Sequence, residues 1–212
     1  MMRTLPAPPS RGHKKRERTR HLLLDAAMVV LADQGDGFSV ADLTAEAGVS
    51  HGTFYNYFAD REELLEALVS HTVTRFAVRM ADQVIDIDPA VRFARISASA
   101  LNVALTEPQM IRVVLRVDGV QHGLLDEGPL AHLRQDLTDG FTSGRFSSPP
   151  DDGTLDVVLG SLLLAARRIA DGEDAMAYRC SILQRLLQAL GIPEPEAANL
   201  ALDAVVDTAS GT

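Results

Sequence analysis

Apolar residues recur at helical spacing from about Lys14 onward, and beyond Arg61 no segment shows the strict alternation of a half-buried strand. Leu23, Ala27, Val30 and Leu31 follow one another three or four residues apart, on one face of a helix. Pro and Gly interrupt the pattern at intervals, as they do between helices. The sequence therefore predicts an all-α fold. Beyond residue 60, helices are expected over about 61–85, 89–105, 108–117, 123–142, 152–171, 174–190 and 194–207.

Charge is unevenly distributed along the chain. The formal net charge is -9 over 212 residues, so phosphate repels the protein as a whole, and any binding to nucleic acid needs a local basic patch. Such a patch exists near the start, where a single acid, Glu17, stands among the bases Arg11, Lys14, Lys15, Arg16, Arg18 and Arg20. By itself this cluster fits a solubilising tail equally well. Residues 1–12 are Pro-rich and lack periodicity, which predicts a disordered arm.

The sequence has no pair of cysteines, no secretory signal and no apolar stretch long enough to span a membrane. Cys180 is the only cysteine, so no disulfide can form within the chain. The early stretch LPAPPSRG lacks the apolar core of a secretory signal. Charged residues interrupt every apolar stretch before the roughly 20 residues that a membrane span needs. We expect a cytoplasmic protein with no membrane partner.

The segment from Ser39 to Phe58, SVADLTAEAGVSHGTFYNYF, is typical of two short helices joined by a turn at Gly48. Ser39 followed by Asp42, and Asp60 followed by Glu63, each resemble the capping box that begins a helix. A helical wheel places Phe54 and Phe58 on one side of the second short helix. The spacing therefore predicts a helix-turn-helix whose second helix has one core face and one free face.

The free face of that second helix has the composition expected of a surface that meets phosphate. No carboxylate occurs from Ala47 through Ala59. Ser50 at the helix start can donate to a phosphate, Gly52 allows close backbone approach, and His51 and Thr53 are suited to base edges. Taken one by one, such residues are as typical of ordinary surface or half-buried packing. Their joint placement favours DNA binding.

From about Lys14 to Leu65 the chain resembles the TetR family of regulators. The resemblance is carried by LLLDAAMVVLADQG, by the segment SVADLTAEAGVSHGTFYNYF and by the ADREELLEAL that follows. It implies that, after the arm expected over 1–12, a three-helix DNA-binding domain spans 13–60 and a larger helical effector-binding and dimerisation domain spans 61–212. The family commonly has Lys where this chain has Arg61, a change that keeps the positive charge. The candidate DNA-binding residues are Ser39, Ser50, His51, Gly52, Thr53, Tyr55, Asn56, Tyr57, Arg61, Lys14 and Lys15.

Two helical stripes late in the chain are candidates for a dimer interface. One lies within 152–171 and the other within 174–190. The stripes alone fit closure of the domain's own core equally well, and the resemblance favours a homodimer that binds a palindromic operator. The candidate dimerisation residues are Leu155, Leu159, Leu162, Leu163, Ala166, Met176, Cys180, Leu183 and Leu187.

The resemblance also implies a cavity for a small-molecule effector, which we expect to be apolar or amphipathic. Core packing or a solvated face would explain each of its candidate residues individually. These candidates are Phe76, Met80, Phe93, Met110, Arg112, Leu115, Arg116, His122 and Phe141. Binding of the effector is expected to release the protein from double-stranded DNA.

Other classes of function have less support in the sequence. An enzyme is a weaker interpretation, because no nucleophile elbow, phosphate loop or dinucleotide fingerprint occurs, and no cofactor is expected. His122, His132 and Asp118 give only a weak hint of metal binding. A regulator that responds to a partner protein instead of a small molecule stays open, as does the choice between repressor and activator.

Overall fold

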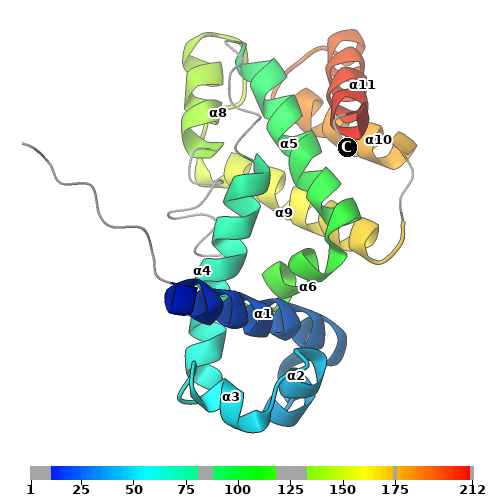
Figure 1. The fold of residues 1–212 in the computed structure, drawn as a ribbon. Coiled ribbons are helices and arrows are strands. Elements are labelled where there is room, and N and C mark those ends of the chain that lie inside the picture. Colours follow the sequence, from blue (N-terminus) through cyan, green and yellow to red (C-terminus); the bar gives the residue numbers. More distant parts are fainter. Residues whose placement is uncertain (1–10, 81–87, 118–132, 174–175, 211–212) are drawn as a thin grey trace, which may run out of the picture. The chain divides into compact units, whose positions relative to one another are not determined.

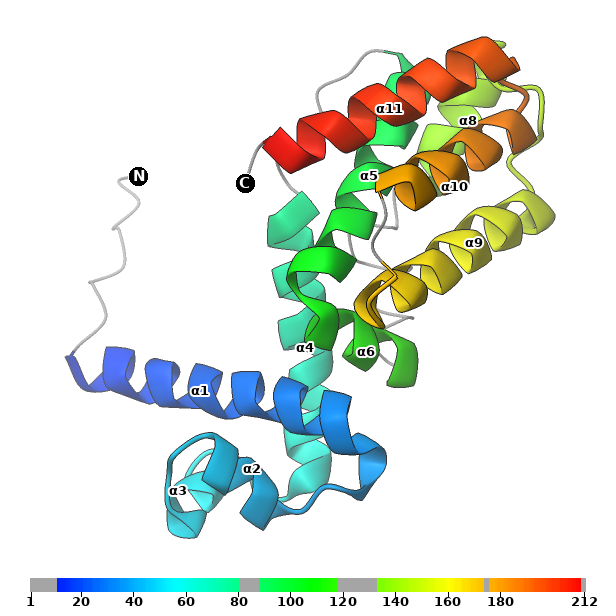
Figure 2. The ribbon, with the colours of Figure 1, turned by 90° about the vertical axis from the view of Figure 1, so that its right-hand side faces the viewer.

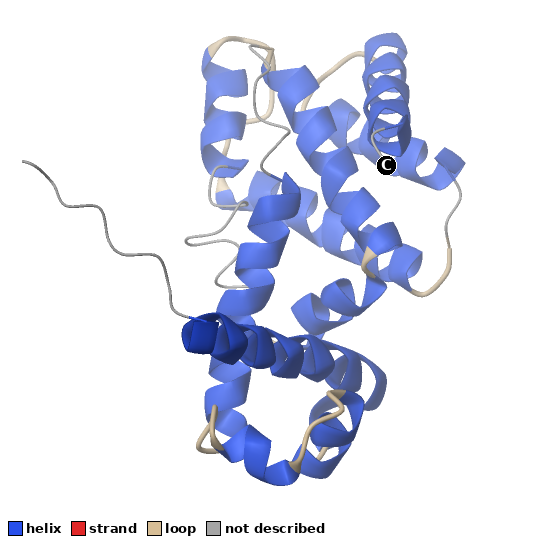
Figure 3. Cartoon of the chain, viewed as in Figure 1, coloured by secondary structure: helices blue, strands red, loops and turns tan. Residues whose placement is uncertain are grey.

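A computed structural model describes residues 11–80, 88–117, 133–173 and 176–210 of the chain. Within those ranges the secondary structure is helical and contains no strand (Figure 3), which confirms the predicted all-α fold. The chain divides into an N-terminal unit, Met1–Leu68, and a C-terminal unit, Val69–Thr212. The helices are α1 (Arg11–Gln34), α2 (Val40–Glu46), α3 (His51–Tyr55), α4 (Arg61–Met80), α5 (Pro89–Thr106), α6 (Pro108–Arg116), α8 (Leu133–Thr142), α9 (Asp152–Ala170), α10 (Met176–Ala189) and α11 (Glu194–Ser210), with a short 3-10 turn over Gly35–Gly37.

The N-terminal unit contains α1, α2, α3 and the first turns of α4. All four helices contribute apolar side chains to its core. The fully buried ones include Leu24 and Leu31 of α1, Leu43 of α2, Phe54 of α3 and Leu64 of α4. Helix α1 begins at Arg11, a few residues before the expected start. Lys, Arg and Glu are good helix formers, so the basic cluster continues the helix instead of belonging to a tail. Of the expected arm, residues 1–10 lie outside the described ranges.

The C-terminal unit is organised around α5. This helix packs against α9 and α11 and also contacts α6, α8 and α10 (Figures 1 and 2). Its buried residues include Phe93 and Leu101 on one side and Ser99 and Val103 on the other, so they lie around much of its circumference, as expected for a central helix. The predicted helix ranges agree with α4, α5, α6, α9, α10 and α11 to within a few residues at each end. Of the range predicted over 123–142, only Leu133–Thr142 is described.

Polar side chains fix the beginning of α5 to other parts of the same unit. Asp88 caps α5, because its carboxylate accepts from the backbone N–H of Ala90 at 2.7 Å, and Pro89 occupies the first helical position, where an N–H is not needed. Arg145, which follows α8, donates from Nε to both oxygens of Asp88 at 3.0 and 3.1 Å, and a terminal nitrogen of the same side chain donates to Glu196 of α11. One guanidinium therefore ties the starts of α5 and α11 to the segment after α8.

Candidate DNA-binding surface and effector cavity

The helix-turn-helix forms as its capping residues predict. Ser39 and Asp42 make a complete capping box, in which the Ser39 hydroxyl accepts from the Asp42 N–H at 3.2 Å and the Asp42 carboxylate accepts from the Ser39 N–H at 2.8 Å. The Ser39 hydroxyl also donates to the Asp42 carboxylate, and this bond, followed by the one from the Ser39 N–H, lowers the pKa of Asp42. Gly48 forms the turn with a φ of +64°, a conformation that strains any residue with a Cβ. Ser50 then caps α3 by accepting from the Thr53 N–H at 3.2 Å.

The capping box predicted at the start of α4 forms only one of its two hydrogen bonds. Asp60 accepts from the Glu63 N–H at 2.9 Å, as expected of a cap. The Glu63 carboxylate accepts instead from the N–H of Ala59, one residue before the cap, at 2.6 Å. Both bonds still satisfy N–H groups around the first turn of α4.

Helix α3 has the two faces that the helical wheel predicts. Phe54 and Phe58 are at most 1% exposed and their ring centroids lie 5.8 Å apart, so they fix the helix to the body of the unit. His51, Gly52, Tyr55 and Asn56 are exposed. The rings of His51 and Tyr55 meet edge to face at 5.3 Å across one turn. The free face of α3 therefore presents an imidazole, a phenol and an amide around a glycine.

Gly52 is not required by the packing of the protein itself. A Cβ built at this position meets no atom within 4 Å, and its φ lies outside the positive range that demands glycine. The bare backbone at this point of α3 therefore faces open space. Close approach of another molecule is the physical use that such a gap offers.

Three of the hydroxyls predicted for the DNA surface already have partners in the protein. The Ser39 hydroxyl donates to Asp42 Oδ2 at 2.6 Å. The hydroxyl oxygens of Ser50 and Thr53 lie 2.8 Å apart and share a hydrogen bond. Ser39 and Ser50 are exposed and Thr53 is half-buried. Their local function is to begin α2 and α3.

The basic start of α1 lies beside the end of the helix-turn-helix. The Arg16 guanidinium lies 5.8 Å from the ring centroid of Tyr57, and that of Arg20 lies 5.3 Å from the ring of Phe58. Lys14 and Lys15, one turn earlier, are exposed. The sequence candidates included these two lysines but omitted Arg16 and Arg20. Their four-residue spacing was the available signal, because it places both arginines on one side of α1.

Of the remaining cation and tyrosines, Arg61 and Tyr57 are half-buried and Tyr55 is exposed. Arg61 stacks its guanidinium 4.5 Å from the ring centroid of Phe38, and its side chain is half-buried. Tyr57 is half-buried beneath Arg16, whereas Tyr55 is 53% exposed. Stacking on a ring orients a guanidinium while its N–H groups can still reach an anion. Arg16 and Arg61 therefore contribute oriented positive charge to this unit.

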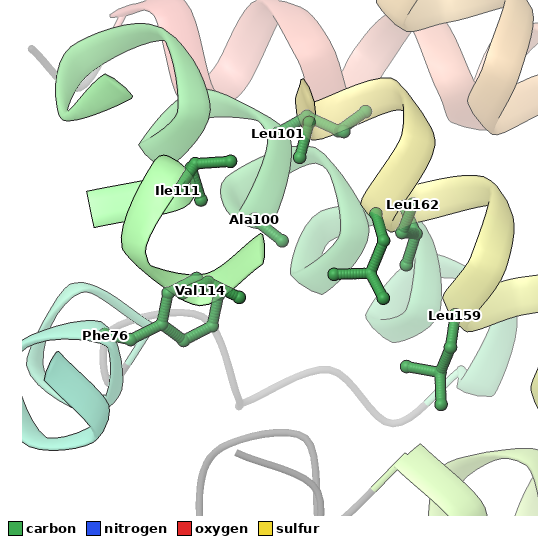
Figure 4. A pocket seen from close by; sticks show the side chains of 9 residues that line it. Phe76, Ala100, Leu101, Ile111, Val114, Leu159 and Leu162 are labelled. Atoms are coloured by element: carbon green, nitrogen blue, oxygen red, sulfur yellow. The ribbon is translucent and has the colours of Figure 1, made fainter. Parts of the chain in front are cut away.

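An apolar cavity of about 50 Å³ lies inside the C-terminal unit (Figure 4). Its walls come from α4, α5, α6 and α9, and every lining residue has a hydrocarbon side chain. They are Phe76, Ala100, Leu101, Ile111, Val114, Leu159, Leu162, Leu163 and Ala166. A cavity with such walls is suited to an apolar group and offers it no hydrogen bond.

A second hollow, of about 20 Å³, has two polar residues among its lining. It shares Ala100 and Leu162 with the apolar cavity. Its other lining residues are Phe93, Ile96, Ser97, Leu133 and Asp136. Ser97 is 2% exposed, and Asp136 forms an ion pair with Arg92, with Oδ1 2.8 Å from Nε. The second hollow is therefore lined by a serine and an aspartate as well as by apolar side chains.

The predicted effector residues separate into different places. Phe76 lines the apolar cavity, Phe93 lines the adjoining hollow, and Met110 is fully buried. Phe141 is 43% exposed on α8. His122 and the side chain of Met80 lie outside the described part of the structure.

Arg112, Leu115 and Arg116 line a different hollow from the apolar cavity. This hollow measures about 280 Å³ and also includes Arg167 and Asp171. Arg112 donates to the carbonyl of Ala170 at 3.0 Å. The spacing of the two arginines correctly placed them on one face of α6, but that face is not the one that lines the apolar cavity.

Four of the nine residues predicted for the dimer interface are buried within their own subunit. Leu162, Ala166, Leu183 and Leu187 are at most 9% exposed, which leaves little of them for a second copy. Leu159 and Leu163 line the apolar cavity. Leu155 and Cys180 are half-buried, and burial raises the pKa of the Cys180 thiol. Met176 is 43% exposed. The exposed apolar residues of α9 are instead Val157 and Leu164, at 53% and 55%.

Two negative findings apply to the described ranges alone. No helix there is long and apolar enough to cross a membrane. No group of three or more His, Cys, Asp or Glu side chains in those ranges could hold a metal ion. His122, His132 and Asp118, which gave the metal hint, fall in the part left undescribed.

Known proteins resemble the chain in both units. Residues 23–68 match the family described as "Bacterial regulatory proteins, tetR family", and residues 88–202 match "Tetracyclin repressor-like, C-terminal domain". The HTH-type transcriptional repressor LfrR of Mycolicibacterium smegmatis is 42% identical over 76 residues, 35% of this chain. The fatty acid metabolism regulator protein of Bacillus subtilis is 33% identical over 72 residues, 33% of this chain. The matches span 40% and 37% of those relatives' lengths.

Solved structures extend the resemblance over nearly the whole chain. RolR in complex with its ligand resorcinol aligns with a TM-score of 0.62 and 29% identity, covering 89% of this chain and 95% of RolR. A TetR family regulator from Shewanella sp. PV-4 aligns with a TM-score of 0.69 and 22% identity, over 82% and 99% of the two chains, and shares the fold. The C-terminal family match alone covers more than half of the sequence. The chain belongs to the TetR family of bacterial regulatory proteins.

Proposed function

We propose that this protein is a ligand-responsive transcriptional repressor that binds operator DNA through α3. The observation that carries the proposal is the free face of α3, which is exposed, lacks carboxylates and surrounds a glycine with no neighbour within 4 Å. The buried pair Phe54 and Phe58 holds the opposite face. A short helix held in this way matches how a helix-turn-helix presents its second helix to the major groove.

The exposed residues divide naturally between reading bases and holding phosphates. His51 and Gly52 at the start of α3 are suited to the groove floor, because the first turn of the second helix meets the base edges. Tyr55, Asn56, Tyr57 and Arg61 supply donors for phosphates around it. Lys14, Lys15, Arg16 and Arg20 of α1 add the positive charge that an acidic protein needs near a duplex. Ser39, Ser50 and Thr53 act by fixing helix starts, whose N–H groups can donate to phosphates.

A dimer is part of the proposal, since one helix of this length buries too little surface for tight and specific binding. Val157 and Leu164 are seven residues apart on α9, two turns along one face, and Gly160 between them is exposed. Exposed branched apolar residues on one helix face favour an interface with another α-helix. A second copy related by a two-fold axis would bury this face and pair two copies of α3 with a palindromic operator.

Effector binding would control the DNA-binding surface through α4. Phe76 of α4 lines the apolar cavity, while Arg75 and Arg79 on neighbouring turns both bind Glu107, directly before α6. Ile111 and Val114 of α6 line the same cavity. An effector that changes the packing between α4 and α6 would therefore act on a helix that continues into the N-terminal unit. The similarity to RolR, a protein solved with resorcinol, supports a small molecule over a protein partner.

The test of this proposal is selection of duplexes from a random pool by the purified full chain. We expect enrichment of a palindrome at modest ionic strength, and retention of two chains per bound duplex. A promoter carrying that palindrome between its core elements should be silenced in a reporter strain. Absence of any enriched duplex would refute the proposal, and activation of the reporter would refute the repressor assignment.

A further inference from the structure

One hollow of the C-terminal unit, the arginine-lined hollow, has three arginines among its lining residues. It measures about 280 Å³, roughly nine times the volume of about 30 Å³ that one water molecule takes in the liquid. Its walls come from the last turns of α6 and the end of α9, two helices that pack against each other (Figure 2). The lining residues are Arg112, Leu115, Arg116, Arg167, Ala170 and Asp171. The hollow therefore has room for a small organic molecule.

The lining of the arginine-lined hollow is positively charged. Three guanidinium groups share it with one carboxylate, which leaves a formal charge of +2. Asp171 Oδ1 lies 4.0 Å from Arg112 Nε, and Asp171 Oδ2 lies 3.9 Å from Arg167 Nε. Both distances are longer than a hydrogen bond, so the carboxylate offsets the two guanidiniums only by charge. Guanidiniums from α6 and α9 therefore approach one another at this carboxylate.

Helix dipoles explain only part of this charge. The carbonyl ends of α6 and α9 both lie at the hollow, and cations are stabilised at such ends. Arg112 has this role, because it donates to the Ala170 carbonyl at 3.0 Å, a bond that also orients its guanidinium. Each helix end is equivalent to only about half a negative charge, so two ends and Asp171 together do not neutralise three arginines. An excess of positive charge remains in the hollow.

We propose that the arginine-lined hollow binds a small organic anion whose carboxylate or phosphate group is held by Arg112 and Arg167. A guanidinium presents N–H groups in a planar fork that matches two oxygens of such a group. Leu115 and Ala170 provide an apolar wall for the carbon part of the ligand, and the positive lining repels cations.

This site is separate from the apolar cavity. The two hollows have no lining residue in common, although α6 and α9 contribute to both. On α6, Ile111 and Val114 line the apolar cavity, whereas Arg112 and Leu115 line the arginine-lined hollow. The proposal therefore concerns a second ligand and does not depend on the proposed function.

Arg167 has a matched control one residue further along α9. The Arg168 side chain is 51% exposed, pairs with Glu173 at 3.2 Å and is not among the residues that line the hollow. The Arg167 side chain is 68% exposed, so neither Arg167→Gln nor Arg168→Gln disturbs the core. Each variant removes one positive charge from the same helix turn, but only the first removes it from the hollow. Asp171→Asn instead removes the negative charge from the lining.

The experiment measures binding of three probes to the purified full chain by calorimetry at fixed ionic strength. The probes are succinate, glycerol 3-phosphate and succinamide, the neutral counterpart of succinate. We expect at least one of the two anions to bind with a Kd below about 1 mM, and succinamide to bind at least about ten-fold more weakly than that anion, since charge-assisted hydrogen bonds contribute that much. The anion with the lower Kd distinguishes a carboxylate site from a phosphate site.

The variants test where the anion binds. Arg167→Gln should weaken its binding about ten-fold, and Arg168→Gln should change it by less than about two-fold. Asp171→Asn should strengthen binding by about two- to five-fold, a gain that partial unfolding could not produce. Kd values above about 1 mM for both anions, equal effects of the two arginine variants, or weaker binding by Asp171→Asn would overturn the proposal.

A DNA phosphate is the other anion that arginines could hold. Arg167→Gln should therefore also be compared with wild type for its affinity for a selected duplex, without added anion. We expect unchanged affinity. A loss of duplex affinity equal to the loss of succinate or glycerol 3-phosphate affinity would assign the arginines to DNA and overturn the proposal. If the protein selects no duplex, the proposed function fails, and calorimetry still decides whether the hollow binds an anion.

Discussion

Gly48 and Gly52 allow the same substitution to test structure and DNA binding separately. Both glycines are exposed in the helix-turn-helix, and a Cβ at either position would meet no atom within 4 Å. They differ in backbone conformation, because Gly48 has a φ of +64° and Gly52 lies inside α3 without a positive φ. A methyl group at each position should therefore have opposite effects on the stability of the fold.

The magnitudes follow from that difference. Gly48→Ala places an L-residue in the left-handed region and should lower the free energy of unfolding by about 1–2 kcal/mol. Gly52→Ala adds helix propensity without a clash and should raise it by up to about 1 kcal/mol. At Gly52 the methyl group would occupy the space that we assign to the operator. Loss of one base-edge contact costs about 1–3 kcal/mol, so operator affinity should fall roughly ten- to hundred-fold.

Two assays on the same samples separate these effects. Urea unfolding followed by circular dichroism measures stability, and fluorescence anisotropy with the selected duplex measures affinity at a temperature where both variants are folded. We expect Gly48→Ala to be less stable with nearly unchanged affinity, and Gly52→Ala to be at least as stable with reduced affinity. Wild-type affinity in Gly52→Ala would show that the backbone of α3 does not approach DNA there, and our assignment of the free face would fail.

Two further predictions concern the C-terminal unit. Burial alone would raise the pKa of Asp88, but hydrogen bonds from Arg145 and from the Ala90 N–H outweigh it and lower that pKa below 3.8. The stability contributed by this carboxylate is therefore present above its unfolded pKa near 3.8 and is lost as the pH falls through the folded value. Arg145→Ala should lower the free energy of unfolding by about 1 kcal/mol at pH 7, because Asp88 is partly exposed to solvent. At pH 3 the loss should be smaller. Denaturant titrations at the two pH values measure it, and an equal loss at both would contradict the prediction. Leu164→Asp puts a charge on the exposed face of α9 and should shift the protein from dimer to monomer in sedimentation at micromolar concentration. Its helicity should stay unchanged. A persisting dimer would place the interface elsewhere.

The sequence predicts well those features that local chemistry decides. Ser39 and Ser50 mark the starts of α2 and α3 because a side-chain oxygen is needed there, and Gly48 marks the turn because of its positive φ. Phe54 and Phe58 reveal the buried face of α3 through their four-residue spacing. Each of these signals depends on neighbours within a few residues, so it can be read without the rest of the fold.

Features that depend on distant packing cannot be predicted in this way. Helical spacing shows that α9 has apolar faces, but it does not tell which face meets the subunit's own core. Leu159 and Leu163 therefore fit a dimer seam on the wheel, although they line the cavity, while Val157 and Leu164 are the exposed pair. Asp136 has no local signal at all, since its position at the hollow arises from packing of α8 against α5.

The central claim is that the start of α3 reads bases while the flanking cations hold phosphates. Selection and sequencing of bound duplexes with wild type, His51→Ala and Arg61→Ala tests it directly. We predict that His51→Ala selects an altered sequence, whereas Arg61→Ala keeps the wild-type preference with weaker binding to every duplex and a shallower dependence on salt. Identical changes in the two variants, or an unaltered preference in His51→Ala, would contradict the account.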